Sequence, residues 1–226
     1  MRIAILGNGK MGKRISKLAI ERGHTISCKS SSKHPATNLD LSNSDIAIDF
    51  STPNSAFNNI SHALNSNIPV ISGTTAWLNK LEDVINLCKK KNGAFLYASN
   101  FSLSVNLFLM LNKQLAKLMK EHNYKTAIHE IHHSEKLDAP SGTAINIAKQ
   151  MDKILERETL ITSERINNIN GIHKVSYISD IDEIEIIHTA KNRDGFAIGA
   201  IIAAEWIIGK KGIFSIKDIF EKQKSL

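Results

Sequence analysis

The residues with the greatest capacity for chemistry stand together near the middle of the chain, in the run Glu130-Ile131-His132-His133-Ser134-Glu135-Lys136-Leu137-Asp138-Ala139-Pro140-Ser141-Gly142-Thr143-Ala144. Imidazole titrates near neutral pH, so His132 is a candidate proton donor. Ser141 is placed to cap a helix, which would turn the backbone N–H groups of Gly142 and Thr143 outward as an anion site. Lys136 adds a positive charge nearby. We therefore expect a proton donor beside a site for carboxylate or phosphate groups.

A metal site is the first alternative, because His129, His132 and His133 fall within five residues. Adjacent residues on a strand point to opposite faces, and His129 and His133 would lie about 13 Å apart at ~3.3 Å per residue. No cysteine is close in the sequence. We therefore expect no metal here. A second alternative is that these histidines are simply satisfied within the protein core.

A second candidate for anion binding follows later in the chain, where His188 and Arg193 bracket a turn. A guanidinium can hold a carboxylate through two parallel hydrogen bonds, so Arg193 is a candidate substrate-binding residue. The alternative is an ordinary surface arginine. Together with Lys136, Arg193 favours a small molecule with two carboxylates as the substrate.

The N-terminus carries the motif Gly7-Asn8-Gly9-Lys10-Met11-Gly12 directly after an apolar run. The spacing G-x-G-x-x-G between a strand and a helix is typical of the turn that binds the pyrophosphate of a dinucleotide. The positive end of the following helix would assist. We expect all six residues to contact the cofactor; the alternative is a tight turn without a ligand.

The segment after the second apolar run indicates which dinucleotide is bound. Chains that select NADH carry an acidic residue there, whereas this sequence has Cys28-Lys29-Ser30-Ser31-Ser32-Lys33. Lys29, Lys33 and the serine hydroxyls could neutralise a 2′-phosphate, which favours NADPH over NADH. The alternative is a mobile surface loop with no preference.

Two more loops are expected at the carboxyl ends of strands, where ligands bind in open α/β sheets. They are Gly73-Thr74-Thr75 and Ala98-Ser99-Asn100-Phe101. Their positions suit the nicotinamide half of the cofactor. The alternative is ordinary turn chemistry, since these residue types favour turns for local reasons.

Short apolar runs alternate with amphipathic helical patterns over the first hundred residues, which predicts a parallel, doubly wound sheet. After residue 101 the pattern changes to a long helix, a strand, a helix and two strands, and we expect one more strand around Phe196–Ala203. A short final helix should begin at Ser215, capped by its hydroxyl. The expected fold class is therefore α/β: a Rossmann-type domain (residues 1–101 plus 204–226) completed by the C-terminal helix, and a smaller α+β domain with a mixed sheet (residues 102–203).

Composition excludes several other classes of protein. The chain has 226 residues, 42% of them hydrophobic, a net charge of +7 and two cysteines. It is too cysteine-poor for a secreted disulfide scaffold, so we expect a cytoplasmic protein. Glu205 interrupts the longest apolar stretch, which is shorter than the roughly 18 to 20 residues of a membrane span. The basic residues are scattered, so we expect neither nucleic acid nor membrane as a partner.

The run from Glu130 to Ala144 resembles the signature of the 4-hydroxy-tetrahydrodipicolinate reductases, also called dihydrodipicolinate reductases, bacterial enzymes of the diaminopimelate route to lysine. The resemblance covers essentially the full chain. Further matching segments are the glycine turn, Asp49-Phe50-Ser51, Gly73-Thr74-Thr75, Asn100-Phe101-Ser102, the His188–Arg193 turn, Phe196-Ala197-Ile198-Gly199-Ala200 and Gly212-Ile213-Phe214-Ser215. The sequence departs from the family pattern at Ser104, where glycine is expected, and in a shortened stretch between Glu156 and Gly171.

The resemblance implies a role for each part of the chain. His132 would be the proton donor, Lys136 its catalytic partner, and His133, Gly142 and Thr143 substrate-binding residues. The glycine turn and the two loops at residues 73–75 and 98–101 would line the reduced cofactor. The second domain's sheet would build a homotetramer, with Phe196–Ala203 part of the subunit contact. Two alternatives remain: a different Rossmann oxidoreductase acting on another small acid, and a nucleotide-sensing regulator without catalysis.

Overall fold

The computed structural model describes residues 1–221, which divide into two compact units. Among the described residues, the first unit comprises Met1–Leu103 and residues 194–221, and the second comprises Ser104–Arg193. None of the described helices has the length and apolarity required to cross a bilayer.

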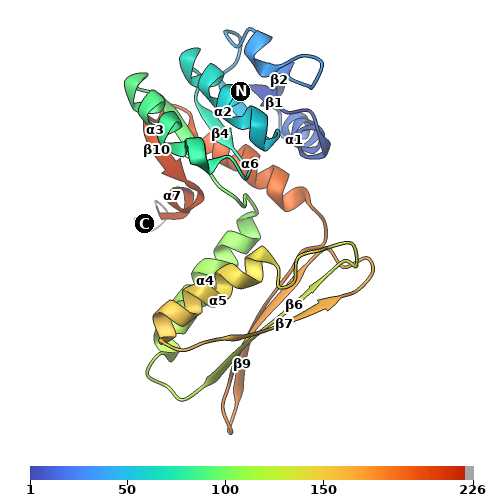
Figure 1. Cartoon of the computed structure of the whole chain (residues 1–226), viewed down its shortest axis with the longest axis vertical. Helices are drawn as coiled ribbons and strands as arrows, with labels where there is room; N and C mark the ends of the chain where they lie inside the picture. The colour runs from blue at the N-terminus through green and yellow to red at the C-terminus, as the bar shows by residue number, and fades with distance from the viewer. Residues whose placement is uncertain (222–226) are drawn as a thin grey trace. The chain divides into compact units, whose positions relative to one another are not determined.

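The first unit is built on a six-stranded sheet in the order β10-β5-β4-β3-β1-β2, in which every pairing is parallel (Figure 1). Its strands are β1 (Arg2–Leu6), β2 (Thr25–Lys29), β3 (Ile46–Asp49), β4 (Val70–Ser72), β5 (Ala94–Tyr97) and β10 (Gly212–Ser215). The registers Leu6↔Asp49, Asp49↔Ser72 and Ser72↔Tyr97 align the carboxyl ends of the four central strands. The loops after these strands therefore meet at one edge of the sheet.

Helices cover both faces of this sheet. They are α1 (Lys10–Glu21), α2 (Pro53–Asn65), α3 (Leu81–Lys90), α6 (Asp194–Ile207) and α7 (Ile216–Glu221), with short 3-10 helices at Ala36–Asn38 and Leu78–Lys80. Ile3 and Ile5 of β1 share one buried cluster with α1 and α6, whereas Ala4 and Leu6 share another with α2 and α3. The alternation places successive side chains of a strand on opposite faces, so β1 is buried on both sides. The expected parallel α/β domain is confirmed.

The prediction of a strand at Phe196–Ala203 is wrong, because this segment lies within α6. A continuous apolar run does not reveal by periodicity whether it forms a buried strand or a buried helix. Gly199 lies against the backbone of Phe101, since a Cβ there would stand 1.7 Å from the Phe101 carbonyl oxygen. Helix α6 thus belongs to the first unit, and the chain leaves the second unit at residue 193 instead of 203.

The C-terminal end of the described chain differs from expectation in detail. The helix after Ser215 is present as α7, but a strand that was not expected, β10, precedes it beside β5. Ser215 donates hydrogen bonds from both its backbone N–H (2.6 Å) and its hydroxyl (2.8 Å) to Asp218. The carboxylate of Asp218 therefore caps the start of α7 by accepting from the backbone N–H of Ser215, as one of the two hydrogen bonds of a capping box does.

The second unit is an α+β fold with a four-stranded mixed sheet in the order β7-β6-β8-β9. Its elements are α4 (Leu103–Met119), β6 (Lys125–His132), α5 (Gly142–Leu155), β7 (Leu160–Arg165), β8 (Ile172–Ile178) and β9 (Glu183–Thr189). Strands β6 and β7 are parallel and the other neighbours are antiparallel. Helices α4 and α5 pack with the sheet around Ile128, Val175 and Tyr177 (Figure 1). The expected mixed domain is confirmed, with β7 as an additional edge strand.

Candidate active site

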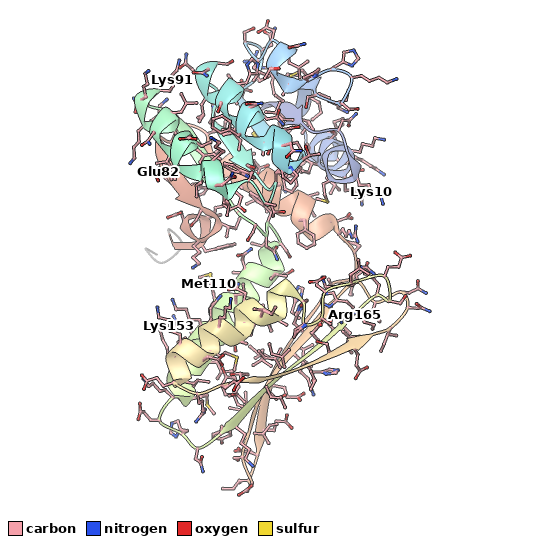
Figure 2. All side chains as sticks on the ribbon, viewed as in Figure 1. Lys10, Glu82, Lys91, Met110, Lys153 and Arg165 are labelled. Atoms are coloured by element: carbon pink, nitrogen blue, oxygen red, sulfur yellow. The ribbon has the colours of Figure 1, made fainter. Side chains whose placement is uncertain are left out.

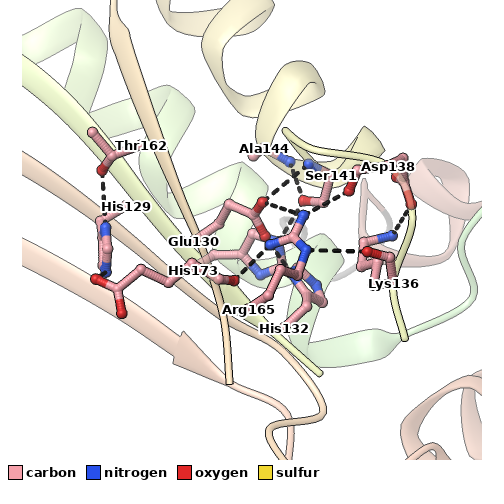
Figure 3. Close-up of polar contacts among 11 residues, drawn as sticks. His129, Glu130, His132, Lys136, Asp138, Ser141, Ala144, Thr162, Arg165 and His173 are labelled. Atoms are coloured by element: carbon pink, nitrogen blue, oxygen red, sulfur yellow. Dashed lines mark hydrogen bonds and ion pairs between the residues drawn. The ribbon is translucent and has the colours of Figure 1, made fainter. Parts of the chain in front are cut away.

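Strand β6 places Glu130 and His132 on its buried face, because residues two apart on a strand share a face. Glu130 is fully buried and His132 is 8% exposed. The Nδ1 atom of His132 is hydrogen-bonded to Oε2 of Glu130 (Figure 3). Since a carboxylate can only accept, Nδ1 carries the hydrogen and Nε2 is left for proton transfer. A Cβ at Gly171 would lie 3.1 Å from Nε2, so glycine at that position keeps side-chain atoms away from this nitrogen.

The surroundings of His132 weaken its hold on a proton. Burial lowers the pKa of His132 below its ordinary value, and the bond to Glu130 offsets this only in part. The positive charges of Lys136 and Arg165 lower the pKa further. A smaller fraction of the ring is therefore protonated at neutral pH, and the protonated form is a stronger acid than a free imidazolium.

A second imidazole lies next to His132 without competing for that proton. The ring centroids of His173 and His132 are 5.1 Å apart. Burial lowers the pKa of His173 to about 4, and the nearby charge of His132 acts in the same direction. His173 is therefore neutral at neutral pH.

Several donors hold the carboxylate of Glu130. His132 bonds one oxygen, and the other accepts from Nη2 of Arg165 at 2.9 Å and from the backbone N–H of Ser141 at 3.3 Å. Burial acts to raise the pKa of Glu130, but the hydrogen bonds from Arg165, Ser163 and His132 outweigh it and lower the pKa. Glu130 is thus an ionised carboxylate that fixes the orientation of His132.

Neither Glu130 nor Arg165 was assigned a role from the sequence. Glu130 did give a signal, because an acidic residue within an apolar strand requires a partner when it is buried. Arg165 gave none, since it lies 35 residues away from Glu130 on a strand that was not expected.

The loop between β6 and α5 brings Lys136 into the same site. Its ammonium group donates to Oδ1 of Asp138 at 2.7 Å. The hydrogen bond from Lys136 lowers the pKa of Asp138, and the backbone N–H of Gly142 contributes in the same direction. Two groups expected to bind a substrate carboxylate, Lys136 and Gly142, thus already face a carboxylate of the chain.

Helix α5 begins as the sequence predicts. Ser141 is its N-cap, and the serine hydroxyl accepts from the backbone N–H of Ala144 at 3.2 Å. The same hydroxyl lies 3.3 Å from Nε2 of His173. Gly142 is exposed and Thr143 half-buried in the first turn, where the positive end of the helix favours anions.

The remaining substrate-binding candidates are His133 and Arg193. His133 follows the end of β6 and is half-buried, while Arg193 is exposed at the end of the second unit. His188 packs on His173 with ring centroids 6.2 Å apart, and its Nε2 lies 2.9 Å from the hydroxyl of Ser104. Ser104, where glycine was expected, therefore contributes a polar contact to His188.

The histidine trio considered from the sequence does not converge. His129 instead bonds Thr162 at 2.9 Å. A different trio, Glu130, His132 and His173, has ligand atoms within 4.8 Å of one another. The guanidinium of Arg165 already stands 2.9 Å from the Glu130 carboxylate. That cation opposes a metal ion at the same oxygen, so this geometry suits a proton better than a metal.

The glycine motif of the first unit lies at a cavity of about 530 Å³. The lining residues are Gly7, Asn8, Gly9, Ser30, Ser31, Ser32, Pro35, Ala36, Thr37, Phe50, Ser51, Thr52, Asn54, Ser55, Asn58 and Asn59. Gly12 permits the turn, because a Cβ there would stand 1.9 Å from the Gly7 carbonyl oxygen. Helix α1 begins at Lys10 with no side-chain cap, which leaves its first N–H groups for a phosphate (Figure 2). The chain therefore has the parts that a dinucleotide needs.

The cavity differs in part from the expected cofactor residues. Lys10, Met11, Gly12 and Lys29 do not line it, and neither do the loops at residues 73–75 and 98–101. Asn54, Ser55, Asn58 and Asn59, from α2, line it instead. Several polar residues in the first two turns of α2 were the signal for them.

Asp49, at the carboxyl end of β3, connects the 73–75 loop to the wall of the cavity. Its buried carboxylate accepts hydrogen bonds at 2.7 to 3.0 Å from Ser51, Asn59, Ser72 and Thr74. Burial raises the pKa of Asp49, while these four donors act against the rise. Thr74 also accepts from the backbone N–H of Ser51 at 2.8 Å. The 73–75 loop and the cavity wall thus share one buried anchor.

Comparison with known families covers nearly the whole chain. The family model for the N-terminal part of dihydrodipicolinate reductase matches residues 1–101, and the model for its C-terminal part matches residues 104–220. In solved structures, the chain is similar to a dipicolinate-bound dihydrodipicolinate reductase from Paenisporosarcina, with a TM-score of 0.78 at 20% identity, covering 97% of this chain and 99% of the other. That likeness confirms the fold.

Curated relatives extend the match at higher identity. The chain is 46% identical to the 4-hydroxy-tetrahydrodipicolinate reductase of Christiangramia forsetii, covering 97% of each chain. It is 35% identical to the enzyme of the same name from Rickettsia canadensis, covering 94% of this chain and 95% of the relative.

Proposed function

This chain belongs to the dihydrodipicolinate reductase family, an oxidoreductase family of lysine and diaminopimelate biosynthesis, and we propose that it reduces 4-hydroxy-tetrahydrodipicolinate to tetrahydrodipicolinate with NAD(P)H. The observation that carries this proposal is the bond between His132 and the buried carboxylate of Glu130, beside Lys136 and the start of α5. A proton donor next to an anion site is what this reaction needs. A nucleotide-sensing regulator would have no use for it.

The substrate is a ring with two carboxylates, which the positive groups of the second unit attract and orient. Lys136 and the N–H groups of Gly142 and Thr143 bind one carboxylate of the substrate. This carboxylate takes the place of the Asp138 side chain, which Lys136 and Gly142 contact in the structure. His133 and Arg193 are the candidates for the other contacts.

His132 completes the reaction with a proton. Loss of water from the hydroxylated ring would leave a conjugated system, and NAD(P)H, when bound, would supply a hydride to ring carbon C4. Nε2 of His132 then donates its proton to the neighbouring carbon of the substrate, while Glu130 holds the imidazole ring through its bond to Nδ1. Lys136 stabilises the negative charge that develops before the proton arrives.

We propose NADPH as the preferred cofactor. The cavity at the glycine motif is bordered by the hydroxyls of Ser31, Ser32 and Thr37, and none of the described residues that line it is acidic. Lys29 and Lys33, on either side of this serine run, supply positive charge for a 2′-phosphate.

Kinetic comparison of the two cofactors tests both proposals. With substrate generated in situ by the preceding synthase, we expect oxidation of NADPH with a kcat/KM about ten-fold above that of NADH. The double variant Lys29→Met/Lys33→Met should lose most of that advantage, whereas Lys89→Met on α3 should keep it. Equal kcat/KM values in the unaltered protein would contradict the NADPH preference alone, and absence of oxidation of either cofactor would contradict the function.

We also propose that the chain acts as a cytoplasmic homotetramer assembled through the sheet of the second unit. Leu160, Ile184 and Ile187 on the edge strands β7 and β9 are exposed, which favours a partner surface. Light scattering should give four times the chain mass of 25.0 kDa. The double variant Ile184→Lys/Ile187→Lys should shift the mass to smaller species, and a monomeric unaltered protein would contradict the proposal.

A further inference from the structure

Arg165 is the last residue of β7 and pairs in register with His132, the last residue of β6. Its side chain is 20% exposed, and Figure 2 shows it at the end of its strand. The guanidinium reaches two parts of the site at once: the Glu130 carboxylate and the loop that carries Lys136.

The first contact compensates a buried charge. Glu130 is fully buried, and Arg165 is the cation bonded to the oxygen that His132 leaves free. Without Arg165, the buried carboxylate would lose the cation that balances its charge and one of the donors that hold it in place. A less firmly held Glu130 would orient the His132 ring less well through its bond to Nδ1.

The second contact holds the loop. Nη2 of Arg165 donates to the Asp138 carbonyl oxygen at 2.6 Å, and Nε donates to the Lys136 carbonyl oxygen at 3.3 Å. The side chains of Glu135, Leu137 and Asp138 are exposed, so burial contributes little to holding this segment. The hydrogen bonds of one arginine therefore tie the loop to the sheet.

We propose that Arg165 is a positioning residue of the reduction, which sets the geometry of the proton donor through Glu130 and the position of Lys136 through the loop. This inference rests on the proposed role of His132. This role requires a guanidinium, because a lysine ammonium cannot donate hydrogen bonds to the carboxylate and to both carbonyl oxygens in the same geometry.

The pH dependence of turnover separates the effect of the Arg165 charge from the effect of its hydrogen bonds. The groups around His132 are Glu130, Lys136, Arg165 and His173. The charge of Arg165 lowers the pKa of His132. Turnover by a protonated donor falls as pH rises through its pKa, so loss of the charge should move this fall to higher pH, and lysine should leave it in place.

The experiment compares Arg165→Met, Arg165→Lys and the control Lys120→Met, which removes an exposed ion pair with Glu156. We expect Arg165→Met to lower kcat about 10- to 100-fold, raise KM for the substrate and shift the fall in turnover to higher pH, with NADPH affinity unchanged. Arg165→Lys should keep the wild-type pH of this fall but retain a raised KM and a several-fold lower kcat. Lys120→Met should match the wild type.

Each outcome decides for or against the role of Arg165. Wild-type kcat, KM and pH profile in Arg165→Met would overturn it, and if that variant does not fold, wild-type kcat and KM in Arg165→Lys would do the same. Loss of kcat in Arg165→Met without any shift in the pH profile would reduce Arg165 to a structural residue and also overturn it. An inactive wild type would instead contradict the function proposed for the whole chain.

Discussion

Replacement of His132 by glutamine is expected to lower kcat by about 100-fold or more while NADPH affinity is kept. Glutamine can still bond Glu130 in place of Nδ1, but it has no proton to donate at Nε2. Because the cavity at the glycine motif lies in the other unit, cofactor binding should not change. Steady-state kinetics with in situ substrate gives kcat, and fluorescence titration gives the NADPH dissociation constant.

A matched substitution separates this effect from a general loss of structure. His122→Gln changes an exposed histidine of the same unit between α4 and β6, and it should retain full turnover. His133→Gln should act mainly on KM, because His133 is assigned to substrate binding. If His132→Gln turned over at the wild-type rate, His132 would be removed from the mechanism.

The elements around His132 show which parts of the site could be predicted from the sequence. The run from Glu130 to Ala144 contains a strand end, a turn and a capped helix, all determined by local residue preferences. Local patterns were therefore enough to single out His132, Lys136 and Ser141 as candidates. Arg165 was missed because its contact depends on pairing between β6 and β7, and no local pattern encodes a partner 35 residues away.

The same distinction applies to the fold. Strands β1 to β5 have short apolar runs separated by turn residues, which local patterns identify well. Residues 194–207 have apolar side chains on nearly every side, because α6 is buried between the sheet and its neighbours. Such a segment has no polar face from which a period could be determined, and the close approach of Gly199 to Phe101 is a tertiary feature.

Removal of the Asp49 carboxylate is expected to be the most damaging change in the first unit. In Asp49→Ala, the four donors from Ser51, Asn59, Ser72 and Thr74 lose their common acceptor in a buried site. Unpaired buried donors and the space left behind should lower the free energy of unfolding by about 3 to 5 kcal/mol. Chemical denaturation monitored by circular dichroism measures this loss.

The same variant should also weaken NADPH binding at least about ten-fold, because two lining residues, Ser51 and Asn59, would lose the anchor that fixes them at the cavity. Asp40→Ala is the control, since Asp40 is an exposed carboxylate of the same unit that bonds its near neighbour Ser42. It should leave both the unfolding free energy and the NADPH affinity at wild-type values. Wild-type stability in Asp49→Ala would show that the hydroxyls find other acceptors. Lower stability with unchanged NADPH affinity would show that the anchor supports the sheet without shaping the cofactor site.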